Sequence, residues 1–130
     1  MTKAHKEMTK KEIAKTYISH LENGKIKQVI ALFTQNGIVE SPLYGIKKAS
    51  DFYLELSNDT TNSELSLLGI FEEQESNTIA LYFTYKWTLK NNQIVKFDVV
   101  DIIEFDNDNK ISKLKIIYDT VIARKLVEQL

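Results

Sequence analysis

The second half of the chain constrains the fold most, because it contains four segments that favour β-strands. They are rich in β-branched and aromatic residues and comprise residues 64–73, 78–90, 94–105 and 111–118. Short polar stretches that favour turns, such as Asn91-Asn92, separate them. Four consecutive strands joined by short turns predict an antiparallel meander.

The first half of the chain has a helical pattern instead. Thr9 and Glu12 have the spacing of a capping box, and apolar residues then recur at helical spacing as far as Leu21. A second, short helix is predicted from Ile26, a third over residues 47–57, and a closing helix over residues 121–130. Helices followed by strands predict an α+β fold.

The segment between the second and third predicted helices has the features of an irregular connection. Asn36-Gly37 predicts a turn. Residues 38–41 are expected to form a brief extended segment that ends at Pro42, the only proline. Gly45 is expected to bend the chain.

Composition excludes several classes of function. The chain has 130 residues, the size of one domain, and no cysteine, which excludes disulfides and thiolate metal sites. Its net charge of -1 favours no nucleic-acid partner, and no stretch has the roughly 18 apolar residues of a membrane span. His5 and His20 have no metal-like neighbours, so we expect no metal and no cofactor. Residues 1–11 lack the apolar run of a signal peptide, so we expect a cytoplasmic protein.

Asp101 is the residue that points most clearly to chemistry. In a strand over residues 97–105, alternation places it on the nearly all-apolar face with Phe97, Val99, Ile103 and Phe105. A buried carboxyl either finds a partner or stays protonated with a raised pKa. In an apolar cavity the neutral acid can donate a hydrogen bond to a developing oxyanion. The alternative is a structural acid bonded to a backbone amide or a tyrosine.

The opposite face of the same strand carries Val100 and Ile102. An apolar patch on an outer sheet face often marks contact with a partner subunit.

Several aromatic residues are candidates for the surroundings of Asp101. Tyr17 lies on the apolar face of the first predicted helix and Tyr53 on the inner face of the third. A buried phenol normally needs a hydrogen-bond partner, but either residue is also an ordinary core residue. Phe83, Tyr85 and Trp87 alternate along one predicted strand, so they either line a cavity or fill it.

These residues fall into a pattern that resembles the nuclear-transport-factor-2-like superfamily, which includes SnoaL-like proteins, and most closely the bacterial Δ5-3-ketosteroid isomerases. The likeness covers roughly residues 10–119 and is carried by residues 17–24, 31–33, 39–42, 45, 52–53, 98–106 and 110–118. It implies a cystatin-like α+β fold, in which a cone-shaped, curved antiparallel sheet wraps around N-terminal helices. It also implies one such domain over residues 1–130, with a core over 9–119 and a C-terminal extension over 120–130.

The resemblance implies roles for individual residues. Tyr17 and Asp101 match the tyrosine and aspartate that form the oxyanion hole of the family. Tyr53 matches a tyrosine that hydrogen-bonds the first one in some members. Tyr118 falls where an aromatic closes the pocket, and Val99 shares the inner face with Asp101. Family members are commonly dimers through the outer sheet face.

One departure from the family separates binding from catalysis. The general base of the family is an aspartate directly before the proline, and Ser41 stands there in this chain. A serine hydroxyl is too weakly basic to abstract a carbon-bound proton, and loss of a positioned base removes about 10²–10⁴-fold of rate. Glu40 is adjacent, but alternation points it to the other face unless a bulge intervenes.

Three hypotheses remain open on the sequence alone. The leading one is a small-molecule-binding domain without isomerase activity, whose apolar ligand directs a carbonyl or phenol oxygen at Tyr17 and Asp101. The second is an isomerase, cyclase or lyase that uses Glu40, Asp119 or a water held by Ser41 as its base. The third is a non-enzymatic oligomerisation module that uses the outer sheet face.

Overall fold

The computed structural model describes residues 8–130. His5 and most of the N-terminal segment on which the cytoplasmic expectation rests lie outside this part of the chain. The elements in chain order are α1 (Lys10–Glu22), α2 (Ile26–Ala31), β1 (Phe33–Ser41), β2 (Gly45–Lys48), α3 (Ala49–Asn58), β3 (Thr60–Glu72), β4 (Thr78–Leu89), β5 (Ile94–Phe105), β6 (Ile111–Ile117) and α4 (Val121–Glu128).

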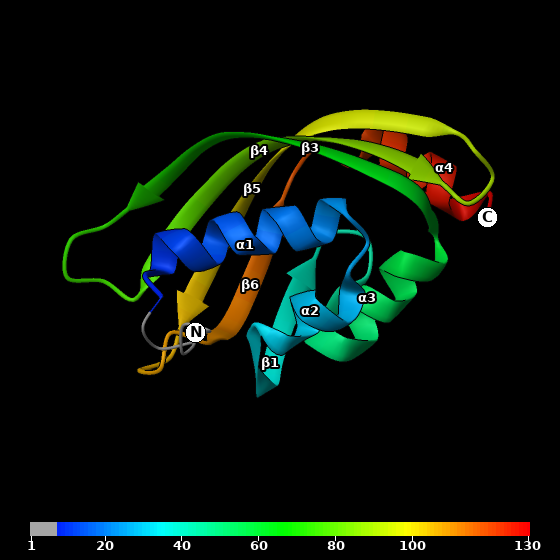
Figure 1. Ribbon diagram of the computed structural model, residues 1–130. Coiled ribbons are helices and arrows are strands. Elements are labelled where there is room, and N and C mark those ends of the chain that lie inside the picture. Colours follow the sequence, from blue (N-terminus) through cyan, green and yellow to red (C-terminus); the bar gives the residue numbers. More distant parts are fainter. Residues whose placement is uncertain (1–7) are drawn as a thin grey trace.

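The strands form one six-stranded sheet in the order β2-β1-β6-β5-β4-β3. Figure 1 shows this sheet curving around α1, with α2 and α3 on the same side. The predicted antiparallel meander is confirmed in β3, β4, β5 and β6, each of which pairs antiparallel with the next. The predicted curved, mainly antiparallel sheet is confirmed, and it contains one parallel pair, β1 with β6, that the sequence did not predict. A parallel pair needs a long crossover, and local turn signals do not reveal one.

The capping box predicted at the start of the first helix is confirmed. The amide of Glu12 donates to Thr9 Oγ1 at 3.1 Å, and the amide of Thr9 donates to Glu12 Oε1 at 3.0 Å. After the helix, Gly24 adopts a φ of 69°, which a residue without a Cβ tolerates best. The helix buries its predicted face, which includes Tyr17 and Leu21, against the concave side of the sheet.

The turn predicted at Asn36-Gly37 is wrong, because both residues lie within β1. The pairing of β1 with β6 shifts register between Phe33 and Ile38 around them. A Cβ built on Gly37 would lie 3.0 Å from the carbonyl oxygen of Ile111 and 3.0 Å from the ring of Phe33. The glycine therefore allows neighbouring atoms to approach the backbone closely inside a strand. In the sequence, a glycine with this role looks the same as a glycine in a turn.

Two further boundaries differ from the sequence prediction. β2 was not predicted, and β3 begins at Thr60 rather than at Glu64. Gly45 does bend the chain, with a φ of 76° at the start of β2. The third and fourth helices lie where the sequence predicts them, and each of their ends agrees within two residues.

The core lies between the concave face of the sheet and the helices. β4 and β5 alternate buried and less buried residues, as strands with one covered face do. Asp101 faces this core, as predicted, and is 1% exposed. No helix within residues 8–130 is long and apolar enough to cross a membrane.

Candidate functional site

A mostly apolar cavity lies between the concave sheet face, α1 and α3. The cavity volume is about 50 Å³. Since about 10–15 Å³ of cavity volume holds one water molecule, the cavity has room for several waters or for a small ligand that displaces them. Eight of the nine residues predicted for a site line it: Tyr17, Ser41, Phe83, Tyr85, Trp87, Val99, Asp101 and Tyr118.

Asp101 brings an unsatisfied polar group into this apolar space. Within residues 8–130, its Oδ1 is the buried side-chain oxygen that has no hydrogen-bond partner. Burial raises the pKa of this carboxyl well above its usual range, so the neutral acid is favoured. A neutral carboxyl carries a hydroxyl hydrogen that it can donate. The structural alternative, an acid bonded to a backbone amide or a tyrosine, has no such bond among the described residues.

Tyr17 and Tyr53 form a buried pair beside Asp101. Their hydroxyl oxygens lie 2.7 Å apart, and either one can be the donor. Tyr17 lines the cavity, whereas Tyr53 is fully buried behind it, so the ninth predicted residue supports the site from outside. Burial raises the pKa of both phenols, and for Tyr17 the nearby Tyr53 and Asp101 raise it further. Both phenols are therefore neutral donors.

Three stacked aromatic rings form one wall. Tyr85 is the cross-strand partner of Phe97, and their ring centroids lie 5.6 Å apart at 21°. Phe97 in turn stacks on Tyr118, with centroids 4.4 Å apart at 18°. The hydroxyls of Tyr85 and Ser63 lie 2.7 Å apart, and burial raises the pKa of Tyr85 to about 12. This wall of the cavity is therefore mainly aromatic.

Ser41 lines the cavity but its oxygen is already occupied. Its Oγ accepts hydrogen bonds from the amides of Leu43 at 3.2 Å and Tyr44 at 3.3 Å. These bonds hold the turn between β1 and β2, as hydroxyl side chains commonly do. A serine hydroxyl is only weakly basic, and the oxygen of Ser41 already accepts two hydrogen bonds. Ser41 is therefore a turn-forming residue rather than a base.

The two carboxylates proposed as substitute bases lie outside the cavity lining. Glu40 follows strict alternation onto the outer face, where it pairs with Lys113 at 3.8 Å and Lys115 at 3.5 Å. Asp119 is exposed, and its Oδ1 accepts a hydrogen bond from the amide of Val121 at 3.0 Å. The structure therefore does not support either acid as a base in this cavity.

Six residues of the lining were not predicted from the sequence. Five of them lie on helix or strand faces that were predicted to be apolar or in the last strand: Leu21, Phe52, Leu56, Phe97 and Ile116. The sixth, Tyr44, lies in the turn after Pro42, where no periodic pattern marks a residue as inward-facing. Only the fold of the β1–β2 hairpin brings Tyr44 to the cavity.

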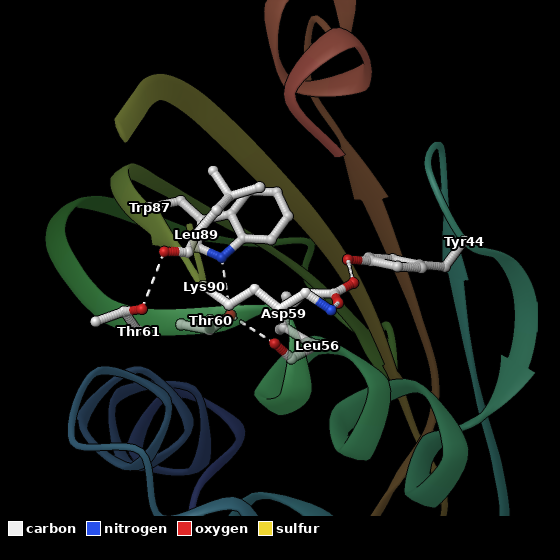
Figure 2. Close-up of polar contacts among 8 residues, drawn as sticks. All are labelled: Tyr44, Leu56, Asp59, Thr60, Thr61, Trp87, Leu89 and Lys90. Carbon is white, nitrogen blue, oxygen red and sulfur yellow. Dashed lines mark hydrogen bonds and ion pairs between the residues drawn. The ribbon is translucent and has the colours of Figure 1, made fainter. Parts of the chain in front are cut away.

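A set of polar contacts fixes the side of the cavity near Tyr44 (Figure 2). The indole Nε1 of Trp87 donates to Thr60 Oγ1 at 2.8 Å, and the Thr60 hydroxyl donates to the carbonyl of Leu56 at 2.5 Å. Tyr44 Oη donates to Asp59 Oδ2 at 2.7 Å. These bonds attach wall residues from β4, from α3 and from the β1–β2 turn to the junction of α3 and β3.

Residues 8–130 contain no group of three His, Asp or Glu side chains placed to hold a metal ion.

Comparisons with known proteins place this geometry in a fold. No family model matches the chain, and a search of curated proteins finds no match. Among solved structures, a nuclear-transport-factor-2-like protein from Burkholderia pseudomallei matches with a TM-score of 0.79 and 15% identity, covering 92% of this chain and 98% of that one. A putative isomerase from Bacillus subtilis matches with a TM-score of 0.77 and 13% identity, covering 95% and 98%.

A third matching structure is that of SalBIII, which is described as an epoxide hydrolase/cyclase-like enzyme with a role in pyran ring formation in the polyether salinomycin. It matches with a TM-score of 0.74 and 16% identity, covering 85% of this chain and 90% of that one. At such identities the likeness shows the fold, and the closer likeness to ketosteroid isomerases stays a prediction. The α+β class predicted from the sequence is confirmed, and the chain has the nuclear-transport-factor-2-like fold.

Proposed function

We propose that the cavity binds an apolar small molecule through one carbonyl or phenol oxygen, with Asp101 and Tyr17 as the hydrogen-bond donors. The observation that carries this proposal is the buried, unpartnered oxygen of Asp101 in an otherwise apolar space. Leaving a buried polar group unsatisfied costs about 1–3 kcal/mol. A ligand oxygen that accepts a hydrogen bond from the neutral acid removes this cost. Because the ligand also excludes water from the cavity, the hydrogen bond is stronger there than in water.

The proposed role is binding without steroid-isomerase activity. Isomerisation requires a base that takes a carbon-bound proton, and Ser41 uses its oxygen to hold the β1–β2 turn. Glu40 and Asp119 lie outside the cavity lining. The donor side of an isomerase site is therefore present without its usual base.

The rings of Tyr85, Phe97 and Tyr118 favour an aromatic ligand, because aromatic rings gain contact energy with one another in both stacked and edge-to-face arrangements. The cavity volume of about 50 Å³ leaves room for a ligand of one or two rings. Two solved structures of the same fold are described as a putative isomerase and as a cyclase-like enzyme, which supports a small-molecule pocket as one use of this fold.

The test is a fluorescence titration with 2-naphthol, a planar phenol, with equilenin as a larger phenol. Asp101→Asn and Tyr17→Phe should each weaken 2-naphthol binding about 5- to 100-fold, since each removes or weakens one buried hydrogen bond. Asp98→Asn, on the exposed face of the same strand, and Tyr82→Phe, on the outer face of β4, are matched controls. An affinity that both site variants leave unchanged rejects the proposal.

We also propose that the outer sheet face contacts a second copy of the chain. Val100 and Ile102 are half-buried there, and their neighbours Ile117 and Phe71 are 48% and 60% exposed. The same face carries charges of both signs, such as Glu40 beside Lys115. A two-fold dimer places one patch against itself, and a patch with both signs is able to match its own copy.

A further inference from the structure

Tyr44 differs from the other polar groups of the cavity, because its hydrogen is already used. Its Oη lies 2.7 Å from Asp59 Oδ2, and a carboxylate only accepts hydrogen bonds. Tyr44 must therefore be the donor in this pair. Tyr44 lines the cavity, and the polar capacity that its hydroxyl retains is the lone pairs of its oxygen, which can only accept.

Both members of the pair are held in place without a ligand. The amide of Tyr44 donates to Ser41 Oγ at 3.3 Å, and its ring packs edge-on against Phe52 with centroids 5.7 Å apart at 82°. Asp59 directly follows α3, and its carbonyl accepts from the amide of Lys90 at 2.9 Å. The Nζ of Lys90 also lies 3.6 Å from Asp59 Oδ1 (Figure 2). The direction of the Tyr44 hydrogen is thus fixed in advance.

We propose that Tyr44, oriented by Asp59, is a second polar anchor of the cavity that accepts a hydrogen bond from a hydroxyl group of the ligand. This rests on the proposed function, in which Asp101 and Tyr17 donate to another oxygen of the same molecule. The ligand class is then a small planar compound with two different oxygens. One oxygen accepts from Asp101 and Tyr17, and the other belongs to a hydroxyl that donates to Tyr44.

The chemistry of the pair makes this preference selective. Because Tyr44 donates to a charged partner, its oxygen is a better acceptor than that of an isolated phenol. A methoxy oxygen at the same place has no hydrogen to donate, so two lone pairs would face each other. The site should therefore prefer a hydroxyl over a methoxy group by about 5- to 100-fold.

The experiment compares probes that differ in one group. Fluorescence titrations would use 2-naphthol, the 2,6- and 2,7-naphthalenediols, and 6-methoxy- and 7-methoxy-2-naphthol. We expect at least one diol to bind about 5- to 100-fold more tightly than its methoxy analogue. Tyr44→Phe should abolish this preference and change the affinity for 2-naphthol by no more than about two-fold.

A second variant tests the role of Asp59. It should raise the affinity for the methoxy analogue relative to the diol, an effect that a loss of packing does not produce. Asp59→Ala releases the hydrogen of Tyr44, which can then donate to a methoxy oxygen. The methoxy analogue should gain affinity relative to the diol, so that the two bind about equally. Glu55→Gln is the matched control: this carboxylate lies on α3, pairs with Lys47 at 2.6 Å and is outside the cavity lining. It should keep the preference for the diol.

The outcomes separate this inference from the proposed function. If 2-naphthol binds through Asp101 but neither diol is preferred, or if the preference survives Tyr44→Phe, the second anchor is wrong and the first proposal stands. If 2-naphthol does not bind to the wild type, both are wrong. Should Tyr44→Phe fail to fold by circular dichroism, an unchanged preference in Asp59→Ala overturns the inference.

Discussion

The hydroxyl oxygens of Tyr17 and Tyr53 lie 2.7 Å apart in the protein interior, and the two residues come from different helices. Only Tyr17 reaches the cavity. If Tyr53 donates within the pair, the hydrogen of Tyr17 is free for a ligand. Tyr53 would then act on the ligand through Tyr17, as a positioning residue.

The first prediction follows from this pair. Tyr53→Phe should weaken 2-naphthol binding about 2- to 10-fold, less than Tyr17→Phe, because the donor itself remains. The same variant should lower the free energy of unfolding by about 1–3 kcal/mol, because it leaves the buried Tyr17 oxygen without its partner. Fluorescence titration and urea denaturation measure the two effects. A larger binding loss in Tyr53→Phe than in Tyr17→Phe would contradict the assigned order.

The second prediction restores a base. Wild type should not isomerise 5-androstene-3,17-dione, and Ser41→Asp should gain about 10²–10⁴-fold over wild type. A carboxylate at this position can still accept the two amide bonds that hold the turn, so the hairpin should persist. Ser41→Asn is the control, since it has the same shape and no basic oxygen.

The readout is the ultraviolet absorbance of the conjugated product. Activity in the wild type would show that another residue is the base and that the binding-only proposal is wrong. Inactivity of both proteins, with 2-naphthol still bound, would show that this steroid does not fit the cavity.

The third prediction concerns stability and pH. Burial raises the pKa of Asp101 in the folded state above its unfolded value, so the folded protein holds this proton more tightly. The stability contributed by the neutral acid is complete below the unfolded pKa and is lost as pH rises towards the folded pKa. In that window the free energy of unfolding should fall by about 1.4 kcal/mol per pH unit relative to Asp101→Asn.

Urea denaturation of the wild type and Asp101→Asn at several pH values above about 4 measures this difference. Asp98→Asn, on the exposed face of β5, should show no such trend relative to wild type. A stability difference between wild type and Asp101→Asn that is independent of pH would mean that Asp101 is charged in the folded protein.

The fourth prediction concerns the outer sheet face. The wild type should sediment as a dimer, and Ile102→Lys should sediment as a folded monomer, because a charge in the centre of an apolar contact cannot be desolvated cheaply. Leu54→Lys changes an apolar side chain of α3 that is 55% exposed, and it should remain a dimer. A monomeric wild type, or a dimeric and folded Ile102→Lys, would reject this interface.

Local patterns predicted much of the fold. The capping box at Thr9 and Glu12 located the start of α1, and alternation along residues 97–105 placed Asp101 on the inner face. These signals work because helix caps and strand faces depend on residues that are close in sequence. The same reasoning placed Glu40 on the outer face, where it pairs with Lys113 and Lys115.

The errors occurred where a local signal had a distant cause. Asn36-Gly37 has the composition of a turn but lies within β1. A residue without a Cβ is needed at Gly37 because Ile111 and Phe33 approach it closely there. β1 pairs in parallel with β6, which lies near the other end of the chain. No local propensity encodes such a pairing, because it depends on how the whole chain closes.

The α+β class, the antiparallel meander and the inward orientation of Asp101 could be predicted from the sequence alone, because they follow from periodicity and turn chemistry within short segments. Three contacts could not be predicted in this way: Tyr17 contacts Tyr53, Ser41 accepts hydrogen bonds within the β1–β2 turn, and Tyr44 donates to Asp59. Each of the two phenol contacts joins side chains from different elements. Their geometry arises from packing between elements, which a linear pattern does not contain.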